Sequence, residues 1–154
     1  MVAKGLVVIG GLCSACSVFL PWMASEGNRV NGLDRDPLST AFDFVLGPGP
    51  VVVLVCGLIT LAFGAAMLAR SEPGPVRTLG SFATGASLVV AIVSAYYAIG
   101  LAIAPYEVLL PSGSFGVYGP SGMPSPLGGG LLLAVGGGLA GVVGGAISIR
   151  NAKR

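Results

Sequence analysis

Apolar residues follow one another in four long stretches that contain no acidic residue, no basic residue and no histidine. The stretches cover residues 5–23, 50–69, 78–103 and 128–149. Each is about as long as the roughly 20 residues that a helix needs to cross a bilayer core of about 30 Å. The pattern therefore predicts an all-α fold: an integral membrane bundle of four transmembrane helices that forms a single membrane domain over residues 1–154.

The composition is that of a chain covered by lipid rather than by water. Hydrophobic residues make up 54% of the chain and charged residues 9%, and the mean hydropathy is +0.91. Typical soluble domains carry about 25% charged residues. The net charge of +2 is too small to indicate a nucleic-acid partner. The three cysteines are too few for the disulfide framework of a small secreted domain.

Basic residues gather at one end of the predicted bundle. The loop of residues 24–49 contains two of them, and the loop of residues 104–127 contains none. The others lie at the N-terminus, in the loop of residues 70–77 and at the C-terminus: Lys4, Arg70, Arg77, Arg150, Lys153 and Arg154. The positive-inside rule then predicts cytoplasmic termini, two outer loops and a multi-pass location in the inner (plasma) membrane.

The ends of the spans and the outer loops carry weaker signals. The first stretch makes a poor cleavable signal peptide, so we expect it to remain as a span that ends at an interfacial Trp22. In the first outer loop, Asn31-Gly32 indicates a turn and a short helix is expected from near Asp36. The second outer loop is rich in proline and glycine, and no regular element is expected between Pro105 and Leu127.

The last apolar stretch has the most specific pattern of the chain. Small residues recur at helical spacing along one arc, including the overlapping steps Gly137-x-x-x-Gly141 and Gly141-x-x-x-Gly145. Such residues let two helix backbones approach closely in a membrane. We call these residues the glycine seam: Gly130, Ala134, Gly137, Gly141, Gly144, Gly145 and Ser148. The opposite side is expected to hold Leu131, Leu132, Val135, Leu139, Val142 and Val143.

Two interpretations of the glycine seam remain open from the sequence. It could pack against the first span, where Gly10, Ser14 and Ser17 form a weaker stripe of small residues. The alternative is that it docks onto a different membrane protein or onto a second copy of the chain. In either case we expect a helix to cover it, because a glycine-rich face gains more from close packing than a leucine face does.

Candidate chemistry is sparse. Cys13-x-x-Cys16 lies within a span with no charge to stabilise a thiolate, so both cysteines are interpreted as small packing residues. Cys56 has no histidine with which to complete a zinc site. The loop oxygens of Asn28, Asn31, Asp34 and Asp36 do not match a calcium-loop spacing. The sequence therefore predicts no enzyme activity, no catalytic residues, no metal and no cofactor.

Two short runs of sequence are similar to those of a known group of membrane proteins. Phe19-Leu20-Pro21-Trp22 ends the first span, and Asn31-Gly32-Leu33-Asp34 follows in the outer loop. In this the chain resembles small four-span membrane proteins of actinobacteria, a family largely without assigned activity. In size and plan it is similar to accessory subunits of actinobacterial respiratory supercomplexes and lipid-transport assemblies. The resemblance implies a topology and a lineage, and no functional residue.

These observations favour a non-catalytic accessory or stabilising subunit of a larger bacterial membrane complex, with the respiratory chain as one setting. The expected partners are the lipid bilayer and other integral membrane subunits, without nucleic acid or an evident small-molecule substrate. The alternative is a small homo-oligomeric channel or transporter component, including part of a lipid-transport assembly. An ionisable residue inside the membrane, which ion-coupled transporters normally keep, is absent from the four stretches.

Overall fold

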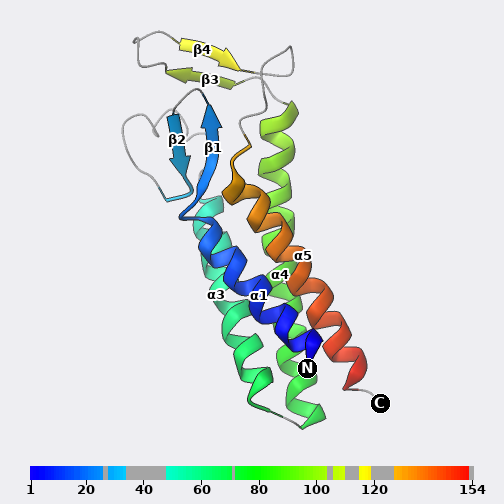
Figure 1. The fold of residues 1–154 in the computed structure, drawn as a ribbon. Helices are drawn as coiled ribbons and strands as arrows, with labels where there is room; N and C mark the ends of the chain where they lie inside the picture. Colours follow the sequence, from blue (N-terminus) through cyan, green and yellow to red (C-terminus); the bar gives the residue numbers. More distant parts are fainter. Residues whose placement is uncertain are drawn as a thin grey trace.

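The computed structural model of the chain is predominantly helical, as predicted. It describes residues 1–25, 28–33, 48–70, 72–103, 106–109, 115–118 and 127–152. The helices within this part are α1 (Val2–Ser17), α3 (Gly49–Leu68), α4 (Pro73–Ile103) and α5 (Gly129–Asn151). Figure 1 shows them packed in one bundle, with both ends of the chain and the α3–α4 connection at the same end.

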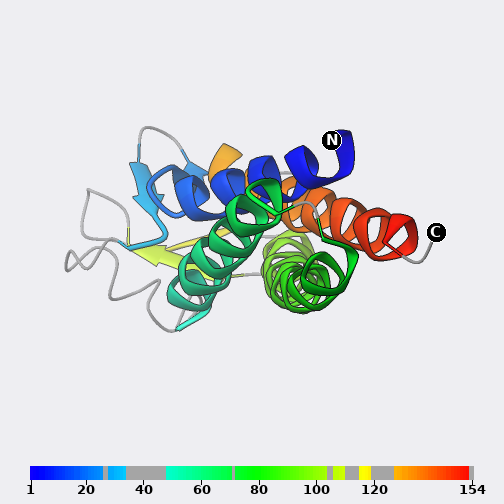
Figure 2. The ribbon, with the colours of Figure 1, turned by 90° about the horizontal axis from the view of Figure 1, so that it is seen from below.

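The four helices are arranged as a ring in which each packs along two neighbours. α1 lies between α3 and α5, and α4 lies between the same two helices on the other side. The diagonal pairs, α1 with α4 and α3 with α5, make few contacts. In Figure 2 α4 is seen almost end-on, whereas the other helices are inclined to it. The first and last helices of the chain are therefore direct neighbours.

Three helices in the described part are long and apolar enough to cross a membrane, which indicates a multi-pass membrane protein. They are α3, α4 and α5, whose most apolar windows have mean hydropathies of 2.6, 1.8 and 2.0. Helix α1 is apolar but has only 16 residues. At 1.5 Å per residue it is roughly 24 Å long, which is shorter than a bilayer core.

The first helix ends earlier than predicted. Instead of continuing to Met23, α1 ends at Ser17, and the chain turns with the Leu20 N–H donating to the Ser17 carbonyl at 3.2 Å. Pro21 explains the difference, because proline has no N–H and disfavours a helical conformation in the residue before it. Proline at the start of a helix is tolerated, and α4 accordingly begins at Pro73, within the predicted loop.

Two small antiparallel hairpins stand at the opposite end of the bundle from the termini (Figure 1). The first pairs β1 (Pro21–Ser25) with β2 (Asn28–Asn31), and the second pairs β3 (Tyr106–Leu109) with β4 (Phe115–Tyr118). The prediction of no regular element between Pro105 and Leu127 is therefore wrong. The β3 and β4 segments are rich in the aromatic and β-branched residues that favour strands. The short helix predicted near Asp36 lies outside the described residues.

Trp22 anchors the first hairpin inside the bundle. Its side chain is 0% exposed, and its indole N–H donates to the Ser17 carbonyl at 3.0 Å. The ring meets Tyr97 edge-on, with 6.0 Å between the centroids. Its carbonyl accepts the Gly128 N–H at 2.8 Å, which ties β1 to the start of α5. The side chain of Trp22 is therefore packed inside the bundle and is not exposed on its surface.

Candidate functional site

The structure places every residue of the glycine seam at buried positions within the chain's own bundle. The buried residues of α5 are Gly130, Leu131, Ala134, Gly137, Gly138, Gly141, Gly144, Gly145 and Ser148. They divide into a row against α1 and a row against α4, because α5 has these two helices as neighbours. The sequence analysis predicted a single arc of small residues, which would have matched one neighbouring helix.

The row against α1 brings two backbones into direct contact. A Cβ added to Gly137 would lie 2.8 Å from the Gly10 carbonyl oxygen, and one added to Gly10 would lie 2.6 Å from the Gly141 nitrogen. At Gly130 and Gly144 the added atom would come within 2.6 and 2.7 Å of carbonyl oxygens at the end and the start of α1. A side chain at any of these glycines would therefore require the backbone of α1 or α5 to move.

The row against α4 was only partly predicted. Gly138, which the predicted seam omits, faces α4 so closely that an added Cβ would lie 2.7 Å from the Ala91 nitrogen. At Gly141 and Gly145 the added atom would overlap hydroxyl oxygens of α4, those of Ser87 and Thr84. Gly138 and Gly145 are two helical turns apart, and this spacing is the signal that would have identified a second row.

The outward side of α5 differs from the prediction at one position. Leu132, Leu139 and Val143 are exposed on the surface of the bundle by 56%, 55% and 50%. Leu131, expected beside them, is instead 0% exposed and packs in the cluster around Trp22. It is buried because the second neighbour, α4, widens the covered arc of α5.

Close glycine contacts also join α1 to α3, and the sequence analysis did not identify them. An added Cβ on Gly57 would lie 2.7 Å from the Ala15 nitrogen, and one on Gly64 would lie 3.0 Å from the Val8 nitrogen. From the α1 side, Gly11 lies directly against the backbone of Leu61. The spacing of Gly57 and Gly64, again two helical turns, was the available signal.

Buried hydroxyl groups line the interior between these contacts. Ser14, Ser17 and Ser94 donate to carbonyls of their own helices at 2.6–2.8 Å. Thr60 of α3 and Ser87 of α4 are 3.2 Å apart across the helix interface. These hydroxyls are thus satisfied inside the bundle, as buried polar groups usually are.

The three cysteines differ in how far they are buried. All are free; Cys13 and Cys56 are partly buried, whereas Cys16 is exposed on the outside of α1. The expected packing role therefore suits Cys13 and not Cys16. Within the described residues no three His, Cys, Asp or Glu side chains come together as a metal site. Of the loop oxygens weighed for calcium, Asn28 and Asn31 lie on β2, and the two aspartates lie outside the described residues.

The site that the geometry defines most clearly is a set of helix contacts centred on α5. Its glycines allow backbone-to-backbone packing against α1 and α4 at once, and such packing stabilises helix association in lipid. The arrangement holds the helices together, and β1 packs against α5 at the end of the bundle where the hairpins lie (Figure 1). No family model, curated protein or solved structure matches this chain.

Proposed function

We propose that the protein is a non-catalytic accessory or stabilising subunit of a larger bacterial membrane complex, with a respiratory-chain supercomplex as the first assembly to test. The observation that carries the proposal is the set of contacts inside the bundle. Glycines bring the backbones together, and the buried hydroxyls Ser14, Ser17, Thr60, Ser87 and Ser94 bond within the bundle. These glycine and hydroxyl contacts hold the helices together, which suits a rigid structural unit.

The outward faces support the same proposal. On α4 the exposed side includes Phe82, Ile92 and Tyr96, which are exposed by 61%, 60% and 72%. Large aromatic and aliphatic side chains on a membrane helix can meet lipid or a neighbouring subunit. Aromatic residues are also those enriched at protein interfaces. We therefore place the partner contact on the outward face of α4 rather than on the glycine seam, which α1 and α4 already cover.

The proposed topology has four spans with both termini in the cytoplasm. It is supported by the placement of Lys4, Arg70, Arg77 and Arg150 at one end of the bundle, and by α1 lying alongside α3 and α5. On a background without cysteine, Glu72→Cys and Ala152→Cys should resist a membrane-impermeant thiol reagent in intact cells. Arg29→Cys, on the first hairpin, should react. Labelling of either of the first two from outside would refute this topology.

The accessory role is tested by native purification in mild detergent from the source membrane. We expect the chain to travel at fixed stoichiometry with a defined complex, and its deletion to lower the thermal stability of that complex. Ile92→Ala with Tyr96→Ala should weaken the association. Leu139→Ala on the outward face of α5 is the matched control and should leave it intact. A chain that purifies alone and whose deletion changes no membrane complex would refute the proposal.

The rival proposal is a small homo-oligomeric channel or transporter component, including part of a lipid-transport assembly. One observation favours it: Ser14, Thr60, Ser87 and Ser94 place hydroxyl groups at buried positions between apolar helices. Reconstitution in liposomes distinguishes the two proposals. Flux that changes with substitutions at Gly137, Gly141 or Ser148 would favour the rival, and liposomes without flux would favour the accessory role.

A further inference from the structure

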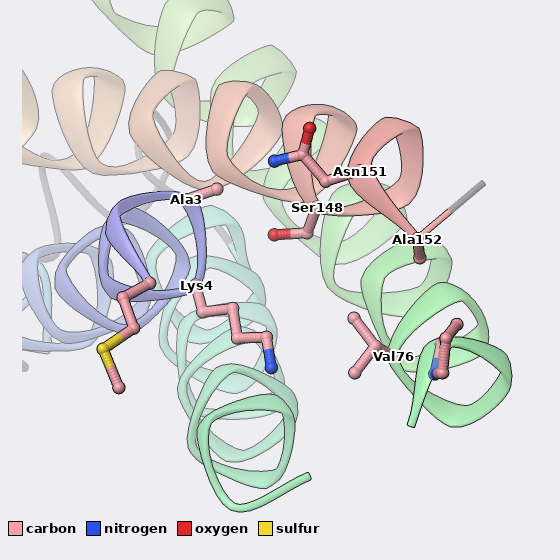
Figure 3. A pocket seen from close by; sticks show the side chains of 8 residues that line it. Ala3, Lys4, Val76, Ser148, Asn151 and Ala152 are labelled. Carbon is pink, nitrogen blue, oxygen red and sulfur yellow. The ribbon is translucent and has the colours of Figure 1, made fainter. Parts of the chain in front are cut away.

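A small cavity opens at the end of the bundle that holds the chain termini. Its volume is about 200 Å³, and it lies among the start of α1, the start of α4 and the end of α5. Lys4, Ser148 and Asn151 supply its polar lining, and Ala3, Val76 and Ala152 supply apolar walls. In Figure 3 the Ser148 hydroxyl is directed from α5 into the space beside α1, with the side chains of Lys4 and Val76 nearby.

Ser148 is unlike the other hydroxyl residues of the helices. It is 4% exposed, and its hydroxyl is the only buried side-chain polar atom of the described residues that has no hydrogen-bond partner. The other serine and threonine hydroxyls of the helices have partners. Most donate to a carbonyl of their own helix, as Ser94 does at 2.6 Å and Thr84 at 2.7 Å, and the Thr60 and Ser87 hydroxyls bond to each other. A buried donor without a partner is costly. Its position in the cavity therefore points to a ligand that accepts its hydrogen bond.

The charge of the cavity indicates the kind of ligand. Lys4 donates one hydrogen bond to the Arg70 carbonyl at 2.7 Å, and an ammonium group has three donors in all. Two N–H groups of Lys4 remain for a ligand, together with the Ser148 hydroxyl (Figure 3). Among the described residues, no carboxylate lines the cavity. Ammonium and hydroxyl donors in one small site are suited to an anion with several acceptor oxygens.

We propose that this cavity binds a phosphate group, with the Ser148 hydroxyl and the Lys4 ammonium as its main donors. The cavity lies where the apolar helices end, which is the level of lipid headgroups. Basic pockets between membrane helices are suited to anionic headgroups, and Ala3, Val76 and Ala152 offer apolar surface to the adjoining glycerol. The phosphate can belong to an anionic phospholipid or be free inorganic phosphate. This site does not depend on the accessory role.

The test measures binding to the full-length purified chain after its lipids have been removed. Short-chain phosphatidylglycerol, inorganic phosphate and uncharged diacylglycerol are titrated separately, and binding is followed by native mass spectrometry and by the shift in Tm. We expect phosphatidylglycerol or inorganic phosphate to bind, and diacylglycerol not to bind. Binding of phosphatidylglycerol alone identifies a lipid-headgroup site, whereas comparable binding of inorganic phosphate identifies a site for free phosphate.

Variants then tie the binding to the cavity. Ser148→Ala and Lys4→Gln should each weaken binding about tenfold, since each removes one strong hydrogen bond to an anion. The matched controls are Ser81→Ala and Arg77→Gln, whose residues are exposed near the same end and do not line the cavity. Without ligand, Ser148→Ala should keep or raise the Tm, so a loss of binding would not reflect misfolding.

Three results would overturn the proposal. The first is the absence of binding by both phosphatidylglycerol and inorganic phosphate. The second is equal binding of diacylglycerol, which would show that acyl chains rather than phosphate are recognised. The third is unchanged affinity in both Ser148→Ala and Lys4→Gln.

Discussion

Two helix interfaces of the same bundle are built in different ways. Between α1 and α5 the backbones touch, with Gly10 against Gly137 and Gly141. Between α3 and α4 side chains meet instead. There the Thr60 and Ser87 hydroxyls lie 3.2 Å apart, and the rings of Phe63 and Phe82 stack with 5.6 Å between their centroids.

The difference shows what each interface can tolerate. Lipid tails are as apolar as leucine, so two membrane helices gain little from burying apolar side chains. The α1–α5 interface gains from close van der Waals contact between backbones and leaves no space for a Cβ. The α3–α4 interface relies on hydrogen bonding and ring packing between flexible side chains, which can adjust. Substitutions should therefore be costly at the first interface and mild at the second.

The largest effect is expected from Gly141→Leu. Its Cβ alone would overlap the Ser87 hydroxyl, so the larger side chain should force α5 away from its neighbours. We expect a loss of about 3 kcal/mol or more in the free energy of unfolding, measured in mild detergent. Leu139→Ala, on the outward face and 55% exposed, should change it by less than about 0.5 kcal/mol. Equal tolerance of both changes would mean that close packing at Gly141 contributes little.

A smaller but sharper effect is expected from adding one methyl group. Gly137→Ala would place its Cβ 2.8 Å from the Gly10 carbonyl oxygen and should cost about 1–3 kcal/mol. The neighbouring Gly136 has no atom within 4 Å of an added Cβ. Gly136→Ala should therefore stabilise the helix by up to about 1 kcal/mol through its higher helix propensity. Thermal melts that move the same way for both variants would contradict the contact between α1 and α5.

The smallest effect is expected at the α3–α4 interface. A double-mutant cycle of Thr60→Val and Ser87→Ala should give a coupling energy of about 0.6 kcal/mol, the typical value for a hydrogen bond between membrane helices. Equilibrium unfolding of the two single variants and the double variant supplies the measurement. A coupling above about 2 kcal/mol would show that this interface is as demanding as the α1–α5 interface.

The length and purity of the apolar stretches were enough to predict a helical membrane protein and the approximate position of its helices. The end of α1 was less predictable because the apolar character continues through Val18–Met23 while the backbone leaves the helix before Pro21. Residues 106–109 and 115–118 form strands in a segment whose prolines and glycines indicated irregular structure. Hydropathy reports the surroundings of a residue and says little about its backbone conformation.

The glycine positions on α5 were visible in the sequence, but the number of its neighbours was not. A single helical arc follows from periodicity, whereas two contact rows require knowing that α1 and α4 both flank α5. That is why Gly138 was omitted and Leu131 was assigned to the wrong side. The cavity at Ser148 was equally beyond sequence reasoning, because Lys4, Val76 and Asn151 are brought together only by the ring of helices.

The ring has a consequence for biosynthesis. Among the described helices α1 is synthesised first, whereas α5, which covers the small-residue face of α1 around Gly10, is synthesised last. The packing of α5 against α1 and α4, and the hydrogen bond from Gly128 to Trp22, can therefore form only after α5 has been inserted. Until then the small-residue face of α1 is open to lipid or to an assembly factor. A chain truncated before α5 would leave this face of α1 uncovered and should be less stable in the membrane than the full chain.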